Sequence, residues 1–183
     1  MTALRERAEH LYDWQRAGIY PTRHDGIHSF VSRVVPSASG LLLDLGSSAG
    51  LLARRLHTDG YDVRCIEANA GVIAAGAQAG TYSTAVPVWH TVLNRASVAN
   101  LSAFVRTIQA RTVIAYRSLA ALDESGATVE AIGDALADAG VQRLVIEERA
   151  IRHHIDRLAG RWTVAELDGP HRAHLINSAN ITE

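Results

Sequence analysis

Short apolar runs and helical segments alternate along most of the chain. The first run, Leu41–Leu45, is apolar except for Asp44, and such runs are typical of strands buried on both faces of a parallel sheet. Four further strands are predicted on similar grounds, at Val63–Ile66, Val86–Leu93, Thr112–Tyr116 and Leu144–Glu147. Apolar residues recur at helical spacing elsewhere, which predicts helices at Leu51–His57, Ala70–Ala79, Val98–Ala110, Val129–Leu136 and Ile151–Leu158. This alternation predicts an α/β fold with a doubly wound, mostly parallel, Rossmann-like sheet.

Both ends of the chain depart from the alternation. Two helices are predicted before the first strand, at Ala3–Ala17 and from an N-cap at Thr22 to Val35, and we interpret residues 1–36 as a helical lid. Two closing strands, Thr163–Leu167 and Arg172–Asn177, are separated by a loop too short to hold a crossover helix, so we expect this pair to be antiparallel. The expected organisation is a single domain over residues 1–183, with a seven-stranded core over residues 40–178.

Composition narrows the function classes. The formal net charge is −1, which argues against a broad electrostatic footprint for nucleic acid. The sequence contains no lysine, so a mechanism that needs a catalytic lysine is excluded. Cys65 is the only cysteine, which rules out an intrachain disulfide. No apolar run approaches membrane-spanning length, and we expect a cytoplasmic protein without a membrane partner.

Candidate chemistry is concentrated where the first strand turns into a helix. This segment runs Asp-Leu-Gly-Ser-Ser-Ala-Gly over residues 44–50. Gly46 permits a tight turn and close approach of a ligand to the backbone, and Gly50 allows the helix to pack closely on the strand. Glu67 follows the second strand, and an acidic side chain at that position suits the two hydroxyls of a ribose. The two signals together predict a nucleotide site at the carboxyl ends of the strands.

This segment resembles the first motif of class I S-adenosylmethionine (SAM)-dependent methyltransferases, an acidic residue at the end of strand one followed by Gly-x-x-x-Gly. Glu67 resembles their ribose-binding acidic residue, and the order of elements resembles their seven-stranded sheet with a reversed final strand. The resemblance implies SAM as the cofactor, with Glu67 and Ala68 at its ribose. The remaining part of its site would be formed by Asp44, Gly46, Ser47, Ser48 and Gly50.

Three more residues receive roles from the same resemblance. Asn94, after the third strand, is the candidate for contact with the adenine. Arg23, in the segment before the sheet, is the candidate partner of the SAM carboxylate. Tyr116, at the end of the fourth strand, occupies the position that faces the reacting methyl group.

A nicotinamide- or flavin-binding Rossmann oxidoreductase is the main alternative. Its Gly-x-Gly-x-x-Gly pattern lacks the middle glycine here, because Ser48 stands in that place. The carboxylate of Asp44 would also repel a bound pyrophosphate, whereas SAM brings an ammonium group to that end of the site. The charges therefore favour SAM.

Two motifs that the sequence lacks narrow the range of possible methyl acceptors. Strand four is followed by Ala-Tyr-Arg-Ser instead of the Asn/Asp-Pro-Pro-Tyr/Phe motif of enzymes that methylate nucleobase amines, and the Lys-Asp-Lys-Glu tetrad of RNA 2′-O-methyltransferases needs lysine. A small-molecule acceptor is therefore favoured over nucleic acid, at an open site or one completed by a homodimer.

Glu147, at the end of strand five, is the positional candidate for acceptor binding or for the base. No metal is predicted, because the His and Glu residues show no recognised ligand spacing. A catalytically degenerate SAM-binding module that serves a partner subunit is a further alternative.

Overall fold

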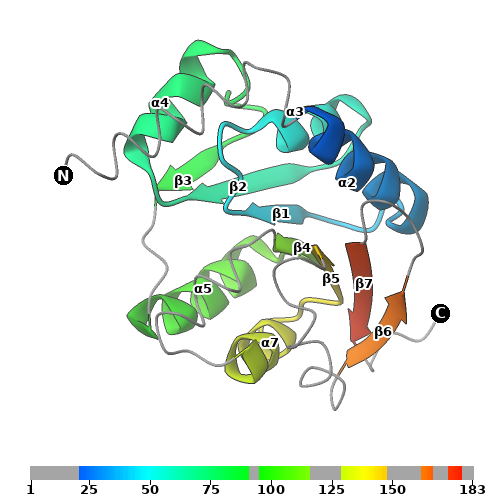
Figure 1. Cartoon of the computed structure of the whole chain (residues 1–183). Helices are drawn as coiled ribbons and strands as arrows, with labels where there is room; N and C mark the ends of the chain where they lie inside the picture. The colour runs from blue at the N-terminus through cyan, green and yellow to red at the C-terminus, as the bar shows by residue number, and fades with distance from the viewer. Residues whose placement is uncertain (1–20, 91–94, 116–128, 148–161, 167–172, 179–183) are drawn as a thin grey trace.

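The computed structural model describes residues 21–90, 95–115, 129–147, 162–166 and 173–178 (Figure 1). The helices are α2 (Pro21–Val34), α3 (Leu51–Thr58), α4 (Ala70–Gln78), α5 (Arg95–Ile108) and α7 (Val129–Asp138). The strands are β1 (Leu42–Leu45), β2 (Val63–Glu67), β3 (Val88–His90), β4 (Thr112–Ala115), β5 (Arg143–Glu147), β6 (Trp162–Glu166) and β7 (Ala173–Ser178).

The strands form one sheet in the order β3-β2-β1-β4-β5-β7-β6. Every pairing from β3 to β5 is parallel, which confirms the predicted α/β fold with a parallel sheet. The β5–β7 and β7–β6 pairings are antiparallel. The chain moves from β1 outward to β2 and β3, and then returns to the other side of β1 with β4. The carboxyl end of β1 therefore lies at the point where the strand order reverses, which is where open α/β sheets bind ligands.

Helices cover both faces of the parallel part of the sheet, as Figure 1 shows. Successive side chains of β1 point to opposite faces, so Leu43 and Leu45 pack in one core with α5 and α7. Leu42 packs in the other core with α2 and α3. Both cores are built mainly from buried aliphatic side chains, and the core with α2 and α3 also contains Phe30, Tyr61 and Tyr82. The buried aliphatic residues of the strands explain the near-continuous apolar runs in the sequence.

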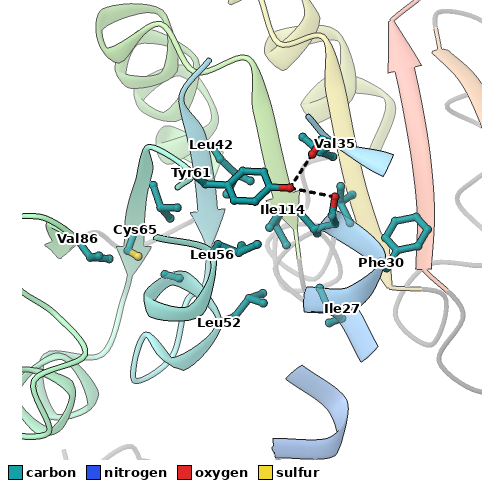
Figure 2. Packing of buried hydrophobic residues seen from close by; sticks show 14 of the residues in the cluster. Ile27, Phe30, Val35, Leu42, Leu52, Leu56, Tyr61, Cys65, Val86 and Ile114 are labelled. Atoms are coloured by element: carbon teal, nitrogen blue, oxygen red, sulfur yellow. Dashed lines mark hydrogen bonds between the residues drawn. The ribbon is translucent and has the colours of Figure 1, made fainter. Parts of the chain in front are cut away.

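The helix α2 packs beside α3 on one face of the sheet. Ile27, Phe30 and Val31 are buried in the same core as Leu42 (Figure 2). The hydroxyl of Tyr61, itself buried, donates a hydrogen bond to the carbonyl oxygen of Val35 at 2.7 Å and so satisfies a group just beyond the end of α2.

Surface ion pairs join the exposed sides of α2 and α3. His28 Nε2 lies 2.6 Å from Asp59 Oδ2, and Asp25 pairs with Arg55. The Asp25–Arg55 pair is exposed, so it contributes little to stability, and the His28–Asp59 contact is a hydrogen bond at the surface.

Some boundaries differ from the sequence prediction. Thr22 lies inside α2 and does not cap it, because the helix includes Pro21, a residue that is favoured in the first turn. β3 begins at Val88, two residues after the predicted start, and Pro87 precedes it at the edge of the sheet as expected. The predicted helices Ala3–Ala17 and Ile151–Leu158 lie outside the described residues.

Candidate functional site

The turn after β1 adopts left-handed backbone conformations at three positions. The φ angles are 77° at Gly46, 55° at Ser48 and 77° at Gly50. The amides of Gly46 and Ser47 both donate to the carbonyl oxygen of Ile66, at 2.8 and 3.1 Å. The turn is thereby bound to the end of β2, as the predicted site requires.

The carboxylate of Glu67 joins the turn to the start of α4. Its Oε2 accepts a hydrogen bond from the amide of Ser48 at 2.9 Å, and its Oε1 accepts one from the amide of Asn69 at 2.8 Å. Asn69 in turn caps α4, because its Oδ1 accepts from the amides of Gly71 and Val72. The two segments that the sequence marked as one site therefore meet in space, and backbone amides fix the direction of the Glu67 carboxylate.

Asp44 is the buried acid of the site. Its side chain is 2% exposed, and within the part of the chain that the structure describes its Oδ2 has no hydrogen-bond partner. Burial, and then the charge of Glu67, raise the pKa of the Asp44 carboxyl from 3.8 to about 7. An unpartnered carboxyl oxygen in the interior is unfavourable, and a cationic ligand group would relieve it.

Tyr82 completes the turn from the segment between α4 and β3. Its hydroxyl donates to the carbonyl oxygen of Ser48 and lies 2.8 Å from the Ser47 hydroxyl. The phenol has one proton, so the Ser47 hydroxyl is the donor to the Tyr82 oxygen. Burial raises the pKa of Tyr82 above its ordinary value, which keeps the phenol protonated and able to donate.

The ring of Tyr82 fits only because two glycines face it. A Cβ at Gly50 would lie 2.5 Å from one edge of the ring, and a Cβ at Gly76 would lie 2.5 Å from the other edge. At Gly50 the missing side chain makes room for the Tyr82 ring, a contact that the sequence interpretation did not include. Thr81 also connects the turn to α4, since its hydroxyl lies at hydrogen-bond distance from the carbonyl oxygens of Ala49 and Gly76.

Sequence reasoning missed Tyr82 and Thr81. The available signal was Gly76, which interrupts an alanine-rich helix at a position where alanine is the better helix former. A glycine in that place indicates that another group occupies the space of its side chain.

The structure places three of the other predicted site residues, and the remaining two lie outside the described residues. Ala68 is exposed, between Glu67 and Asn69. Arg23 lies in the first turn of α2. Glu147 is the last residue of β5, at the sheet edge where β1 and β2 also end. Asn94 and Tyr116 lie outside the described residues.

The donor and acceptor groups fit one kind of ligand. The two carboxyl groups at the turn suit an ammonium group and ribose hydroxyls, whereas the Asp44 carboxylate would repel a pyrophosphate. Three left-handed residues give a ligand close access to the backbone. Among the described residues, no group of three His, Cys, Asp or Glu side chains could hold a metal ion, and no described helix is long and apolar enough to cross a bilayer.

Comparison with known proteins gives structural matches only. No family model matches the sequence, and no curated protein sequence matches it. A TehB-like SAM-dependent methyltransferase from Corynebacterium glutamicum matches with a TM-score of 0.63 at 14% identity, over 97% of this chain and 98% of that one.

Two further neighbours are methyltransferases with named acceptors. The magnesium protoporphyrin IX methyltransferase of Synechocystis, solved with bound SAM, gives a TM-score of 0.58 at 16% identity, over 88% of this chain and 79% of that one. The glycopeptide N-methyltransferase MtfA gives a TM-score of 0.59 at 13% identity, over 86% of this chain and 90% of that one. At these identities the likeness shows the fold, which is that of the class I SAM-dependent methyltransferases.

Proposed function

We propose that this chain, which has the class I SAM-dependent methyltransferase fold, binds SAM at the turn after β1 and transfers its methyl group to a small molecule. The observation that carries the proposal is the pair of carboxyl groups beside this turn. Asp44 is buried, and one of its carboxyl oxygens has no hydrogen-bond partner among the residues that the structure describes. Two backbone amides donate to the Glu67 carboxylate and fix its direction. This arrangement suits a ligand that is cationic at one end and carries hydroxyls at the other.

Each carboxyl group has a separate task in this proposal. Asp44 faces the ammonium of the aminoacyl part, and Glu67 accepts hydrogen bonds from the ribose hydroxyls. The backbone of the turn, which the left-handed residues Gly46 and Ser48 shape, lies against the aminoacyl part. Ser47, Gly50, Ala68, Asn94 and Arg23 complete the proposed cofactor site.

SAM, held by Asp44 and Glu67 at the turn, would supply a methyl group on a positively charged sulfur for transfer to the acceptor. The protein contributes mainly the orientation of the two reactants. Tyr116 is proposed to face the transferred group. Glu147, at the same edge of the sheet as Glu67, is proposed to bind the acceptor or to take its proton.

Several observations support the finer parts of the proposal. The order of seven strands, with β7 antiparallel to β5, is the one expected of a methyltransferase sheet with a reversed final strand. The neighbours named above act on a metalloporphyrin and on a glycopeptide, which favours a small-molecule acceptor here. A homodimer that completes the acceptor site is part of the proposal.

Titration calorimetry with S-adenosylhomocysteine, the product form of the cofactor, tests the binding step. Glu67→Gln should weaken binding by about tenfold or more, because a hydrogen bond to a charged group contributes about 1.5–3 kcal/mol. Asp62→Asn is the matched control, since Asp62 also loses one charge but lies exposed before the start of β2, paired with Arg64. Failure of the parent protein to bind either SAM or S-adenosylhomocysteine would overturn the proposal.

Turnover separates an enzyme from a binding module. Release of S-adenosylhomocysteine from SAM in the presence of pooled small-molecule acceptors supports the methyltransferase. Tight binding with no turnover across such pools would instead favour a degenerate module that serves a partner subunit.

A further inference from the structure

We propose that Tyr82 is a positioning residue, whose hydroxyl holds the Ser48 backbone in the left-handed conformation that the turn needs to receive its ligand. The inference concerns the same site as the proposed function, and its ligand-binding test rests on that function. The effect of Tyr82 on the Ser48 backbone can be tested independently of the proposed function, because the conformation of Ser48 can be measured without any ligand.

Ser48 is held on both sides of its α-carbon. Its amide donates to Glu67 Oε2 at 2.9 Å, and its carbonyl oxygen accepts from the Tyr82 hydroxyl. These two groups belong to the two peptide planes that flank the residue, so together they fix both of its backbone dihedral angles. Few other arrangements of two hydrogen bonds would constrain a single residue so fully.

Ser48 needs such a constraint because it is not a glycine. Its φ of 55° lies in the left-handed region, which non-glycine residues adopt at an energetic cost. The dinucleotide pattern has glycine at this position of the turn, and here the position holds serine. A hydrogen bond from a buried phenol is of the same order as that cost, so its presence decides how well the conformation is populated.

The ring and the hydroxyl of Tyr82 have separable roles. The ring lies between Gly50, just before α3, and Gly76 of α4. The hydroxyl reaches past the ring to Ser48 and accepts from Ser47. Tyr82→Phe therefore removes the hydrogen bond to the turn and leaves the ring in place between the two glycines.

Tyr61→Phe is the matched control. Tyr61 is as buried as Tyr82, at 5% against 6% exposure, and its hydroxyl also donates to a backbone carbonyl, that of Val35 (Figure 2). It lies before the start of β2, at the end of the strand opposite to Glu67. Both variants lose one buried hydroxyl, so a merely structural role predicts that they behave alike.

The first measurement is the exchange of the Ser48 amide proton with solvent in the ligand-free protein, followed by NMR. Tyr82→Phe should speed this exchange by about tenfold relative to the parent, since loosening the Ser48 carbonyl also frees its amide from Glu67. Tyr61→Phe should leave it within about twofold. Equal exchange of Ser48 in Tyr82→Phe and the parent would overturn the inference.

The second measurement is the affinity for S-adenosylhomocysteine by calorimetry. Tyr82→Phe should bind about five- to tenfold more weakly than the parent, and Tyr61→Phe should bind like the parent. In a Ser48→Gly background the effect of Tyr82→Phe should fall below about threefold, because glycine adopts the left-handed conformation without support. An equal loss in both backgrounds would overturn the role assigned to Ser48.

The outcomes separate this inference from the proposed function. If the parent does not bind S-adenosylhomocysteine while the exchange of Ser48 responds to Tyr82→Phe, the proposed function is wrong and the positioning role is supported. If the parent binds and Tyr82→Phe changes neither exchange nor affinity, the proposed function is supported and the positioning role is wrong.

Discussion

At the scale of single residues, burial of the Asp44 carboxyl group lowers the stability of the fold, and the same group is proposed to bind the ligand. Its carboxyl group is fully buried, and among the described residues no group donates to its Oδ2. The pKa of about 7 means that the ligand-free protein holds this carboxyl partly protonated at neutral pH. An ammonium group beside it would favour the charged form and restore the missing partner.

The pH dependence of stability tests this view of Asp44. The carboxyl has a folded-state pKa above its unfolded value, so folding takes up a proton between about pH 4 and pH 7, and the stability that it contributes is lost as the pH rises through that window. Relative to Asp44→Asn, the parent should lose up to about 4 kcal/mol of unfolding free energy across the window. Urea denaturation of both proteins at several pH values measures the difference. A difference that stays constant with pH would contradict a raised pKa.

The pH dependence of ligand affinity tests the same residue in its proposed role. Binding of an ammonium group requires ionised Asp44, so the protein must release a proton when it binds below about pH 7. The affinity for S-adenosylhomocysteine should therefore rise by up to about tenfold per pH unit below pH 7 and level off above it. In Asp44→Asn the affinity should be lower and nearly independent of pH in this range. Calorimetry in buffers of different ionisation enthalpy counts the released proton.

At the scale of elements, the packing of α4 against the turn before α3 depends on the space that two glycines leave for Tyr82. Gly76 lies inside α4, where alanine would ordinarily raise helix stability. A Cβ there would meet the Tyr82 ring at 2.5 Å and the backbone carbonyl oxygen of Ala49 at 2.9 Å. The carbonyl cannot rotate aside as a flexible side chain can, so the helix itself must shift.

Gly76→Ala should accordingly lower the free energy of unfolding by about 1–3 kcal/mol, the usual cost of overpacking. Gly71→Ala, in the first turn of the same helix, is the control, because its nearest contact is the Asn69 side-chain oxygen at 3.3 Å. We expect Gly71→Ala to stay within about 1 kcal/mol of the parent. Chemical denaturation measures both variants, and a stabilising Gly76→Ala would show that the ring does not occupy this space.

The same elements show what sequence can and cannot predict here. The strands of the parallel sheet were predictable because each is an apolar run whose length matches a buried strand, and β2 and β4 begin at the predicted residues. The contact of Glu67 with the turn was predictable because parallel neighbouring strands end at the same edge of the sheet. Tyr82 was not, because its segment has no periodic pattern and its role arises only from contacts with Ser47 and Ser48, more than 30 residues away.

At the scale of the whole molecule, the site forms at the carboxyl ends of β1 and β2, and Tyr82 connects it to one of the two apolar cores. The apolar clusters fill the two faces of the sheet, and the turn, Asp44 and Glu67 gather at the carboxyl ends of β1 and β2. This division lets the sheet carry an unfavourable acid at its edge, because the stability of the domain comes from the buried aliphatic layers. Ligand binding at that edge should then stabilise the domain as a unit.

Thermal unfolding with competing ligands tests this coupling and separates the two cofactor classes. At a concentration of S-adenosylhomocysteine about 100 times its dissociation constant, binding should add about 2.7 kcal/mol to the stability. For a domain of this size that corresponds to a rise in melting temperature of about 5–10 °C. NAD+ at the same concentration should leave the melting temperature unchanged, because its pyrophosphate would lie against the Asp44 carboxyl group. In Asp44→Asn the rise with S-adenosylhomocysteine should shrink, whereas a rise with NAD+ in the parent would mean that the acidic turn accepts a dinucleotide and that the charge argument for SAM is wrong.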